Sequence, residues 1–175
     1  MPNILPSKRL LRVSQAPGEL IQSWNEGISL AKDSGRTVTE LLEKVAADRW
    51  TFASTQRAHA EILMKQKPPL YRSAISRYYY AMYHAMRACV FLWNPGDDHE
   101  EHNKLPLHIP PDFDQKKVNW QVKLKDARLA RNRADYEPYP KANTAWRGVA
   151  ITLQSDTEDL LRVSRLYLRT KGCSL

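Results

Sequence analysis

The chain has 175 residues, of which 42% are hydrophobic and 26% charged, the usual balance for a soluble globular protein. Its length suits one domain, or one domain with an extension. No apolar run is long enough to cross a bilayer, and the N-terminal sequence lacks the pattern of a signal peptide. Cys89 and Cys173 have no metal-type spacing and are typical of a reducing compartment. We therefore expect a cytoplasmic protein without cofactor, metal or membrane contact.

The formal net charge is +8, which favours a polyanionic partner such as nucleic acid. This charge is segregated along the chain. Residues 115–136 contain seven lysines and arginines but two aspartates, whereas residues 94–114 carry six acidic residues and one lysine. A charge run of this kind forms either a binding surface or a solvated helix face, and the sequence leaves both interpretations open.

Helical periodicity and the absence of alternating, strand-like patterns predict an all-α fold. The predicted helices cover residues 18–33, about 37–66 with a break near 48–52, 71–93, about 115–135 and about 143–170. Thr37 and Glu40 form a predicted capping box at the start of the second of these. Residues 94–114 are too rich in proline for a regular helix. The sequence thus predicts an antiparallel four-helix up-and-down bundle over residues 40–175, with an N-terminal helical extension over 1–39.

The segment 71–93, YRSAISRYYYAMYHAMRACVFLW, separates into two faces when it is drawn as a helix. Apolar residues recur at steps of four and three and predict a core seam, which consists of Tyr71, Ile75, Tyr78, Met82, Ala85, Cys89 and Leu92. Residues beside this seam widen it, namely Tyr79, Tyr83, Met86, Val90 and Trp93. The opposite face is polar and basic, with Ser73, Arg77, Tyr80, His84 and Arg87. Among the tyrosines, Tyr80 is the candidate for stacking on a nucleobase.

The second informative segment is Arg131-Asn132-Arg133-Ala134-Asp135-Tyr136. Arg131 falls on the same helical line as Trp120, Leu124 and Ala127, and a charge on an apolar line must be paired or open onto a cleft. Two interpretations remain. Asp135 or another acid holds the guanidinium internally, or the guanidinium presents its planar fork to a phosphate.

Two stretches, AISRYYYAMYHA and ARLARNRADYEPY, resemble the HEPN superfamily of small helical domains in prokaryotic toxin–antitoxin and defence systems. The similarity lies with the branch that carries a YYA-type second helix and an R-x-x-A-D-Y ending to the third. It extends over roughly residues 40–170. The sequence His102-Asn103-Lys104-Leu105 stands where such proteins often place a histidine after the second helix.

This resemblance implies a dimeric four-helix bundle with its site in a cleft near the ends of the third and fourth helices. Ribonucleases of the superfamily cut RNA without metal, using an arginine followed four to six residues later by a histidine. By position, Arg131 corresponds to that arginine, and Tyr136 occupies the place of the histidine. A phenol with a pKa of about 10 is a poor general base, so the resemblance implies RNA binding more firmly than cleavage.

A second arginine–histidine pair, Arg77 and His84, shares one face of the 71–93 helix, although outside the motif position of the superfamily. The candidate catalytic residues are therefore Arg131, Tyr136 and His84. The candidate nucleic-acid-binding residues are Arg77, Tyr80, Arg87, Arg128, Arg131, Asn132 and Arg133. We expect the polar stripe of the 71–93 helix and the segment 131–136 to form the two walls of one groove.

The run Asp97-Asp98-His99-Glu100-Glu101-His102, with His108 nearby, offers carboxylates and imidazoles that could bind a divalent metal. Its histidines are three residues apart, whereas the zincin motif needs two that are four apart on a helix, so an acidic solvated loop is favoured. There is also no Gly-rich phosphate loop, nucleophile elbow or nucleotidyltransferase signature.

Two functions follow as expectations. The first is an RNA-binding, HEPN-like homodimer of a toxin–antitoxin or defence system, with metal-independent ribonuclease activity as its enzymatic form. The second is a non-catalytic antitoxin or interaction subunit that partners a nucleotidyltransferase or another product encoded nearby.

Overall fold

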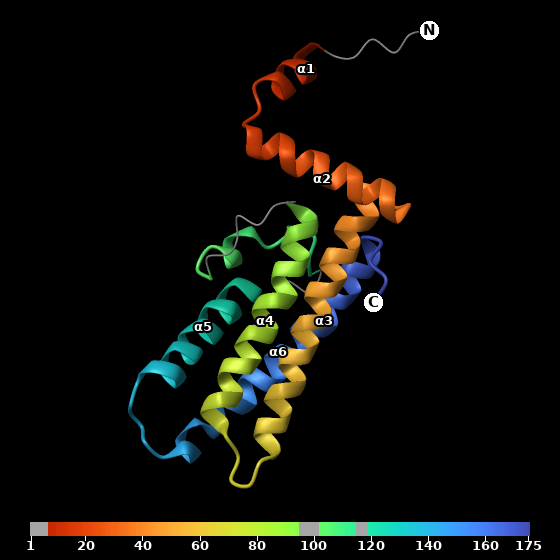
Figure 1. The fold of residues 1–175 in the computed structure, drawn as a ribbon. Coiled ribbons are helices and arrows are strands. Elements are labelled where there is room, and N and C mark those ends of the chain that lie inside the picture. The colour runs from red at the N-terminus through yellow and green to blue at the C-terminus, as the bar shows by residue number, and fades with distance from the viewer. Residues whose placement is uncertain (1–6, 95–101, 115–118) are drawn as a thin grey trace. The chain divides into compact units, whose positions relative to one another are not determined.

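The computed structural model describes residues 7–94, 102–114 and 119–175, and every regular element in these ranges is helical (Figure 1). The all-α prediction is therefore confirmed for the described part of the chain. The elements are α1 (Ser7–Ser14), α2 (Gly18–Ser34), α3 (Val38–Lys65), α4 (Tyr71–Trp93), η1 (Leu105–His108), α5 (Trp120–Tyr136), η2 (Asn143–Trp146) and α6 (Arg147–Thr170). The chain divides into two compact units, residues 1–41 and 42–175, and each is described by itself.

The first unit contains α1, which was not predicted, and α2. The end of α2 was predicted at Ser34-Gly35, and Gly35 adopts a left-handed conformation with φ of 66° there. Leu20, Trp24 and Ile28 share one face of α2, as predicted, but they are 58%, 50% and 48% exposed. Indeed, no residue of α2 is buried. The periodicity therefore identifies the helix and its apolar face, and this face is exposed.

Helix α3 runs without interruption from Val38 to Lys65, so the predicted break near residues 48–52 is wrong. Its beginning follows the predicted capping box, since the Glu40 backbone N–H donates to Thr37 Oγ1 (3.2 Å) and the Thr37 N–H donates to a Glu40 carboxylate oxygen (2.7 Å). The region of the expected break contains neither proline nor glycine. It is also anchored by Trp50, whose indole N–H donates to Ser164 Oγ on α6 at 3.0 Å.

The buried face of α3 is made of small residues. Ala46, Ala53 and Ala60 recur at seven-residue spacing and are fully buried. Two larger apolar residues of this helix, Val45 and Ile62, are 40% and 55% exposed. Small side chains at the contact let neighbouring helices approach closely. Ala53, for example, packs with Ala85 of α4 and Leu161 of α6.

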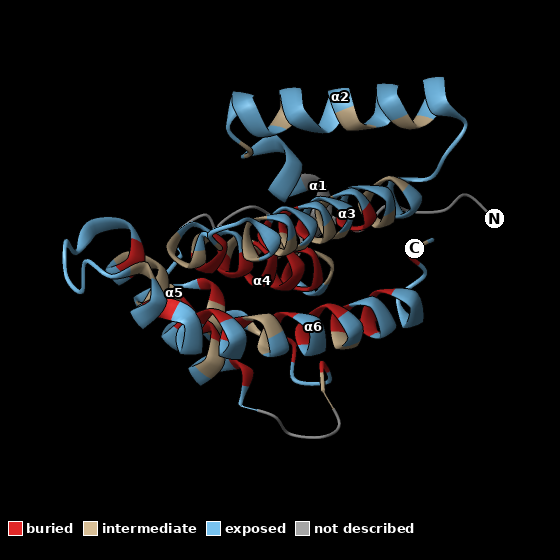
Figure 2. Ribbon diagram, turned by 90° about the horizontal axis from the view of Figure 1, so that it is seen from below, coloured by how far each residue is buried: buried red, intermediate tan, exposed pale blue. Residues whose placement is uncertain are grey.

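Helix α4 is the centre of the second unit and packs against both α5 and α6. The predicted seam is confirmed: Ile75, Tyr78, Met82, Ala85 and Cys89 are fully buried. The residues beside it are buried as well, with the exception of Trp93, which is 51% exposed. Figure 2 shows the buried positions concentrated along α4 and on the adjoining sides of α5 and α6.

Helix α5 is described from Trp120 to Tyr136, and the predicted beginning near residue 115 lies outside the described residues. Asn119 caps it, because its side-chain oxygen accepts a hydrogen bond from the Val122 N–H at 3.0 Å. The preceding proline-rich loop contains one short 3-10 turn, η1. A second such turn, η2, precedes α6, whose buried side includes Ala150, Leu153, Leu160 and Tyr167.

Candidate nucleic-acid interface

The guanidinium of Arg131 on α5 contacts one residue of α4 and two residues of its own helix. One terminal nitrogen donates to Tyr80 Oη at 2.6 Å, and the other donates to Asn132 Oδ1 at 3.0 Å. The third nitrogen, Nε, lies 2.8 Å from Asp135 Oδ2 in an ion pair. The side chain is 19% exposed, so Arg131 is partly and not fully buried. The requirement that this charge be paired is therefore met by Asp135.

Asp135 also joins the two helices, since its other carboxylate oxygen accepts a hydrogen bond from the Ser76 hydroxyl of α4. Partial burial by itself would lower the pKa of Arg131, but the neighbouring Tyr80 and Asp135 outweigh it and raise that pKa. The guanidinium carbon lies 5.3 Å from the ring centroid of Tyr80 and 5.4 Å from that of Tyr136. Arg131 is thus charged, immobilised and flanked by two aromatic rings.

His102 approaches this region from the loop that follows α4. Its ring stacks on Tyr83 with the centroids 4.2 Å apart, and its Nδ1 is 2.6 Å from the hydroxyl of Tyr79. Burial, followed by the charges of Arg131, Arg128 and Arg87, lowers the pKa of His102. The imidazole is therefore neutral at pH 7. The positive charges of these three arginines, which come from two helices, make the electrostatic potential at this ring positive.

His84 of α4 is the second uncharged histidine of the site. Its ring lies between Phe52 of α3 and Tyr83, with centroid distances of 4.7 and 5.1 Å. Burial lowers the pKa of His84 to about 4, and the charges of Arg87, His102 and Arg49 act in the same direction. At neutral pH this ring is a packed, uncharged group. The half-buried ring is part of an aromatic wall with Phe52 and Tyr83.

The residues that converge here come from α4, α5 and the intervening loop. We call them the tyrosine–arginine cluster, and they are Tyr79, Tyr80, Tyr83, His84, Arg87, His102, Arg128 and Arg131. Tyr79 contributes a neutral hydroxyl, because burial raises its pKa well above the usual value. Arg87 lies with its guanidinium carbon 5.9 Å from the Tyr83 ring centroid. The cluster combines cations, flat rings and one exposed imidazole.

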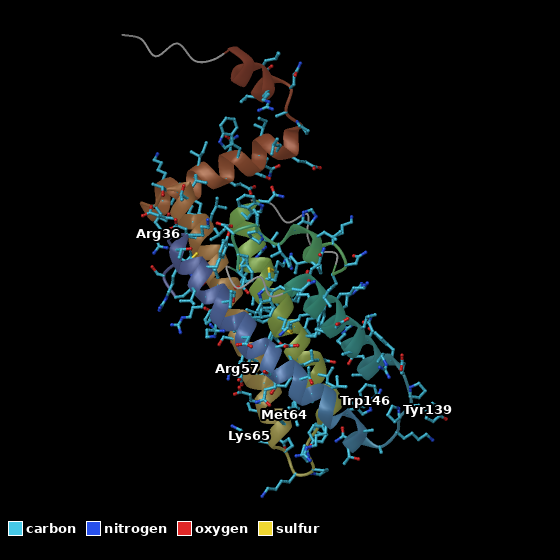
Figure 3. The ribbon with its side chains drawn as sticks, turned by 180° about the vertical axis from the view of Figure 1, so that it is seen from behind. Arg36, Arg57, Met64, Lys65, Tyr139 and Trp146 are labelled. Carbon is cyan, nitrogen blue, oxygen red and sulfur yellow. The ribbon has the colours of Figure 1, made fainter. Side chains whose placement is uncertain are left out.

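Arg72, at the start of α4, holds the end of α5 in place. Its Nε donates to the carbonyl oxygen of Ala134 at 2.8 Å, and a terminal nitrogen donates to that of Glu137 at 2.5 Å. These carbonyls belong to the C-terminal end of the helix, where intrahelical partners are lacking. The guanidinium also lies 4.9 Å from the ring of Trp146, which Figure 3 shows near Tyr139 in the connection between α5 and α6.

Two of the predicted binding residues lie apart from the cluster. Arg77 donates to Gln56 Oε1 of α3 at 3.1 Å, so the expected groove wall from Arg77 to Arg87 is shorter than predicted. Arg133 is exposed and pairs with Glu137 at 3.4 Å, within its own helix. In both cases the helical register turns the side chain toward another neighbour. Tyr136, by contrast, borders Arg131 and is 73% exposed.

His102 is the functional candidate that the sequence-based site omitted. A loop residue has no periodicity, so its neighbours in space cannot be read from the chain. The one available signal was its position after the second helix of a HEPN-like pattern. Most of the acidic run for which a solvated loop was favoured over a metal site, residues 97–101, lies outside the described residues. In the described ranges, no three His, Cys, Asp or Glu side chains gather as metal ligands would.

Comparison with known proteins gives no function for this chain, so its function must be argued from the geometry of the site. No protein-family model, curated protein or solved structure matches the chain. None of the helices in the described residues has the length and apolar character that a membrane span requires.

Proposed function

We propose that this chain binds single-stranded RNA on the tyrosine–arginine cluster. The observation that carries the proposal is the arrangement of cations on aromatic rings: Arg131 lies over the ring of Tyr80, Arg87 lies over the ring of Tyr83, and Tyr83 stacks on His102. Guanidinium groups in such an arrangement attract phosphates and can bind them through two parallel hydrogen bonds. Flat side chains beside them offer stacking surfaces to unpaired bases, which is how proteins hold single-stranded RNA.

The wider assignment follows from the HEPN-like motifs and is part of the same proposal. In it, the long helices α3 to α6 form an antiparallel up-and-down bundle, two copies associate as a homodimer, and the protein acts in a toxin–antitoxin or defence system. Two motifs support it: the YYA segment supplies Tyr79 and Tyr80, and the R-x-x-A-D-Y segment supplies Arg131 and Asp135.

Metal-independent cleavage is the enzymatic form of the proposal, and His102 is better suited to it than Tyr136. With Nδ1–H donated to the Tyr79 oxygen, the Nε2 lone pair of the neutral imidazole can accept a 2′-hydroxyl proton. The 2′-oxygen then attacks the adjacent phosphorus, and the bond to the 5′-oxygen breaks. The products are a 2′,3′-cyclic phosphate and a 5′-hydroxyl that takes up a proton from solvent. Arg131 would hold the phosphate during this exchange.

One observation favours the alternative, a non-catalytic interaction subunit. All three nitrogens of Arg131 have partners within the chain, as in a structural network. In that case the cluster would organise the helices, and a protein encoded nearby, such as a nucleotidyltransferase, would be the partner.

Fluorescence anisotropy with a short single-stranded RNA separates these functions. We expect the wild-type protein to bind and Arg131→Ala to lose about tenfold or more in affinity. Arg77→Ala is the matched control, because Arg77 is a helix arginine that faces α3. A wild-type protein that binds no RNA at low salt would refute the proposal, and its co-purification with a neighbouring gene product would support the alternative.

The same RNA, incubated in EDTA, tests cleavage. A 2′,3′-cyclic product that disappears in His102→Ala but persists in Tyr136→Phe would assign the proton transfer to His102. Binding without any cleavage at high protein concentration would leave a binding protein and exclude the enzymatic form.

A further inference from the structure

A hollow of about 370 Å³ opens beside the cluster, between the η1 turn and the first half of α5. Its volume is at the lower end of the range for small-molecule sites, which fits a group the size of a nucleotide better than a larger ligand. The residues that line it are Asn103, Pro106, Leu107, Gln121, Val122, Lys125 and Arg128. The hollow is therefore built by the loop segment 103–107 and by the helix segment 121–128.

The walls of the hollow differ in chemistry. Pro106, Leu107 and Val122 form an apolar wall, and two of these side chains remain open to solvent, with Leu107 68% and Val122 48% exposed. Covering them would remove apolar surface from water, which is favourable. Asn103 and Gln121 add amides that can both donate and accept hydrogen bonds. Among the residues that the structure describes, no carboxylate lines the hollow, and Lys125 and Arg128 make its α5 side positive.

Arg128 belongs to both the hollow and the tyrosine–arginine cluster. It lines the hollow, and its positive charge acts to lower the pKa values of Tyr79 and His102 in the cluster. The positions of Gln121, Lys125, Arg128 and Arg131 follow steps of four, three and three along α5. Residues at such steps lie on one face of a helix, each within a turn of the next. An extended ligand could thus contact the cluster and the hollow along one continuous basic strip.

We infer that the hollow holds one nucleobase of the RNA strand whose phosphate is bound by Arg128 and Arg131, and that it gives the protein a base preference. This inference rests on the proposed function. The apolar wall packs against the face of the base, while the amides of Asn103 and Gln121 meet the hydrogen-bonding groups on its edge. Because purines and pyrimidines differ at that edge, the amides distinguish among them.

Homopolymeric single-stranded RNAs of equal length test the inference by fluorescence anisotropy at one salt concentration. We expect the wild-type protein to favour one base by about tenfold, the order of a single base contact. Val122→Trp fills the hollow and should lower affinity for the favoured polymer until it equals the others. Gln121→Ala should reduce the preference and preserve affinity for the remaining polymers. Leu129→Trp is the matched control, since Leu129 is a 46% exposed residue of α5 outside the hollow.

The outcomes separate this inference from the function on which it rests. RNA binding that is sensitive to Arg131→Ala, but shows no base preference and no response to Val122→Trp, would overturn the inference and preserve the proposed function. Absence of RNA binding would overturn both. A nucleoside monophosphate could instead bind as tightly as the oligonucleotide and lose its affinity in Val122→Trp. That result would show that the hollow binds a free nucleotide and would overturn its assignment to an RNA strand.

Discussion

The hydroxyl of Tyr80 accepts a 2.6 Å hydrogen bond from the guanidinium of Arg131, and this contact joins the middle of α4 to the last turns of α5. The two residues are also in cation–π contact, because the guanidinium carbon lies 5.3 Å from the centroid of the Tyr80 ring. The phenol therefore stabilises the cation in two ways that can be separated by mutation.

Tyr80→Phe removes the hydrogen bond and keeps the ring. A hydrogen bond to a charged group contributes more than a neutral one, so we expect the free energy of unfolding to fall by about 1–2 kcal/mol. Urea unfolding followed by circular dichroism measures the change. Tyr139→Phe is a suitable control, since Tyr139 is 66% exposed. Equal stability of Tyr80→Phe and wild type would show that the hydroxyl contributes nothing net.

The number of phosphates that the basic strip contacts can be read from the salt dependence of RNA binding. Each contact with a single strand contributes a slope of about 0.7 in log affinity against log salt. Arg128→Gln should reduce the magnitude of the slope by about this amount. Arg77→Gln should leave it unchanged, because Arg77 is bonded to Gln56 on α3. Identical slopes for Arg128→Gln and wild type would exclude a phosphate contact at Arg128.

Stability should depend on pH through His84. An unfolded histidine titrates near pH 6.5, whereas burial lowers the pKa of His84 to about 4 in the folded chain. Between these values the unfolded chain binds a proton that the folded chain does not, so acid favours unfolding. The contribution is fully present above pH 6.5 and declines as the pH falls towards 4. The lowered pKa of His102 acts in the same direction.

His84→Gln removes one of these titrating groups and keeps a polar side chain. Urea midpoints measured between pH 7 and pH 4.5 should therefore decline less steeply in the variant than in the wild type. The carboxylates titrate in both proteins and cancel in the comparison. Parallel pH profiles would contradict the assignment of this sensitivity to His84.

The close packing of α3 predicts that larger side chains are not tolerated on its alanine face. Ala53 is fully buried against Ala85 and Leu161, so Ala53→Leu should lower the free energy of unfolding by about 1–3 kcal/mol. Ala58→Leu, on the exposed side of the same helix, controls for helix propensity. If urea unfolding shows the same stability for both variants, the contact between Ala53, Ala85 and Leu161 accommodates a leucine without loss of stability.

Much of the fold was predictable because it depends on local patterns. The seam of α4 follows from its four- and three-residue steps, and the start of α3 follows from the capping box of Thr37 and Glu40. The sequence could not predict burial where burial depends on contact with another helix. Leu20, Trp24 and Ile28 form an apolar face, but periodicity cannot say whether another element covers it. The alanines of α3 were overlooked because large side chains dominate a hydrophobic pattern.

The candidate site was predictable only in part, for a related reason. Tyr80 and Arg131 occur in motifs, and each shares a helix face with its neighbours, so both could be proposed from the chain. Arg77 has the same face and charge as its neighbours, yet Gln56 of α3 binds it. His102 comes from an irregular loop, and its contact with Tyr79 depends on how that loop folds back over α4.

The paired hydrogen bonds from Arg72 have a consequence for variation among proteins of this architecture. They tie the last turn of α5 to the first turn of α4 through one side chain, which also lies against Trp146 at the end of the connection. Exposed segments tolerate insertions at small entropic cost, so the exposed residues 138–142 of this connection can change in number while the spacing of the two helices stays constant. We therefore expect related chains to differ in this connection and to retain an arginine at the position of Arg72.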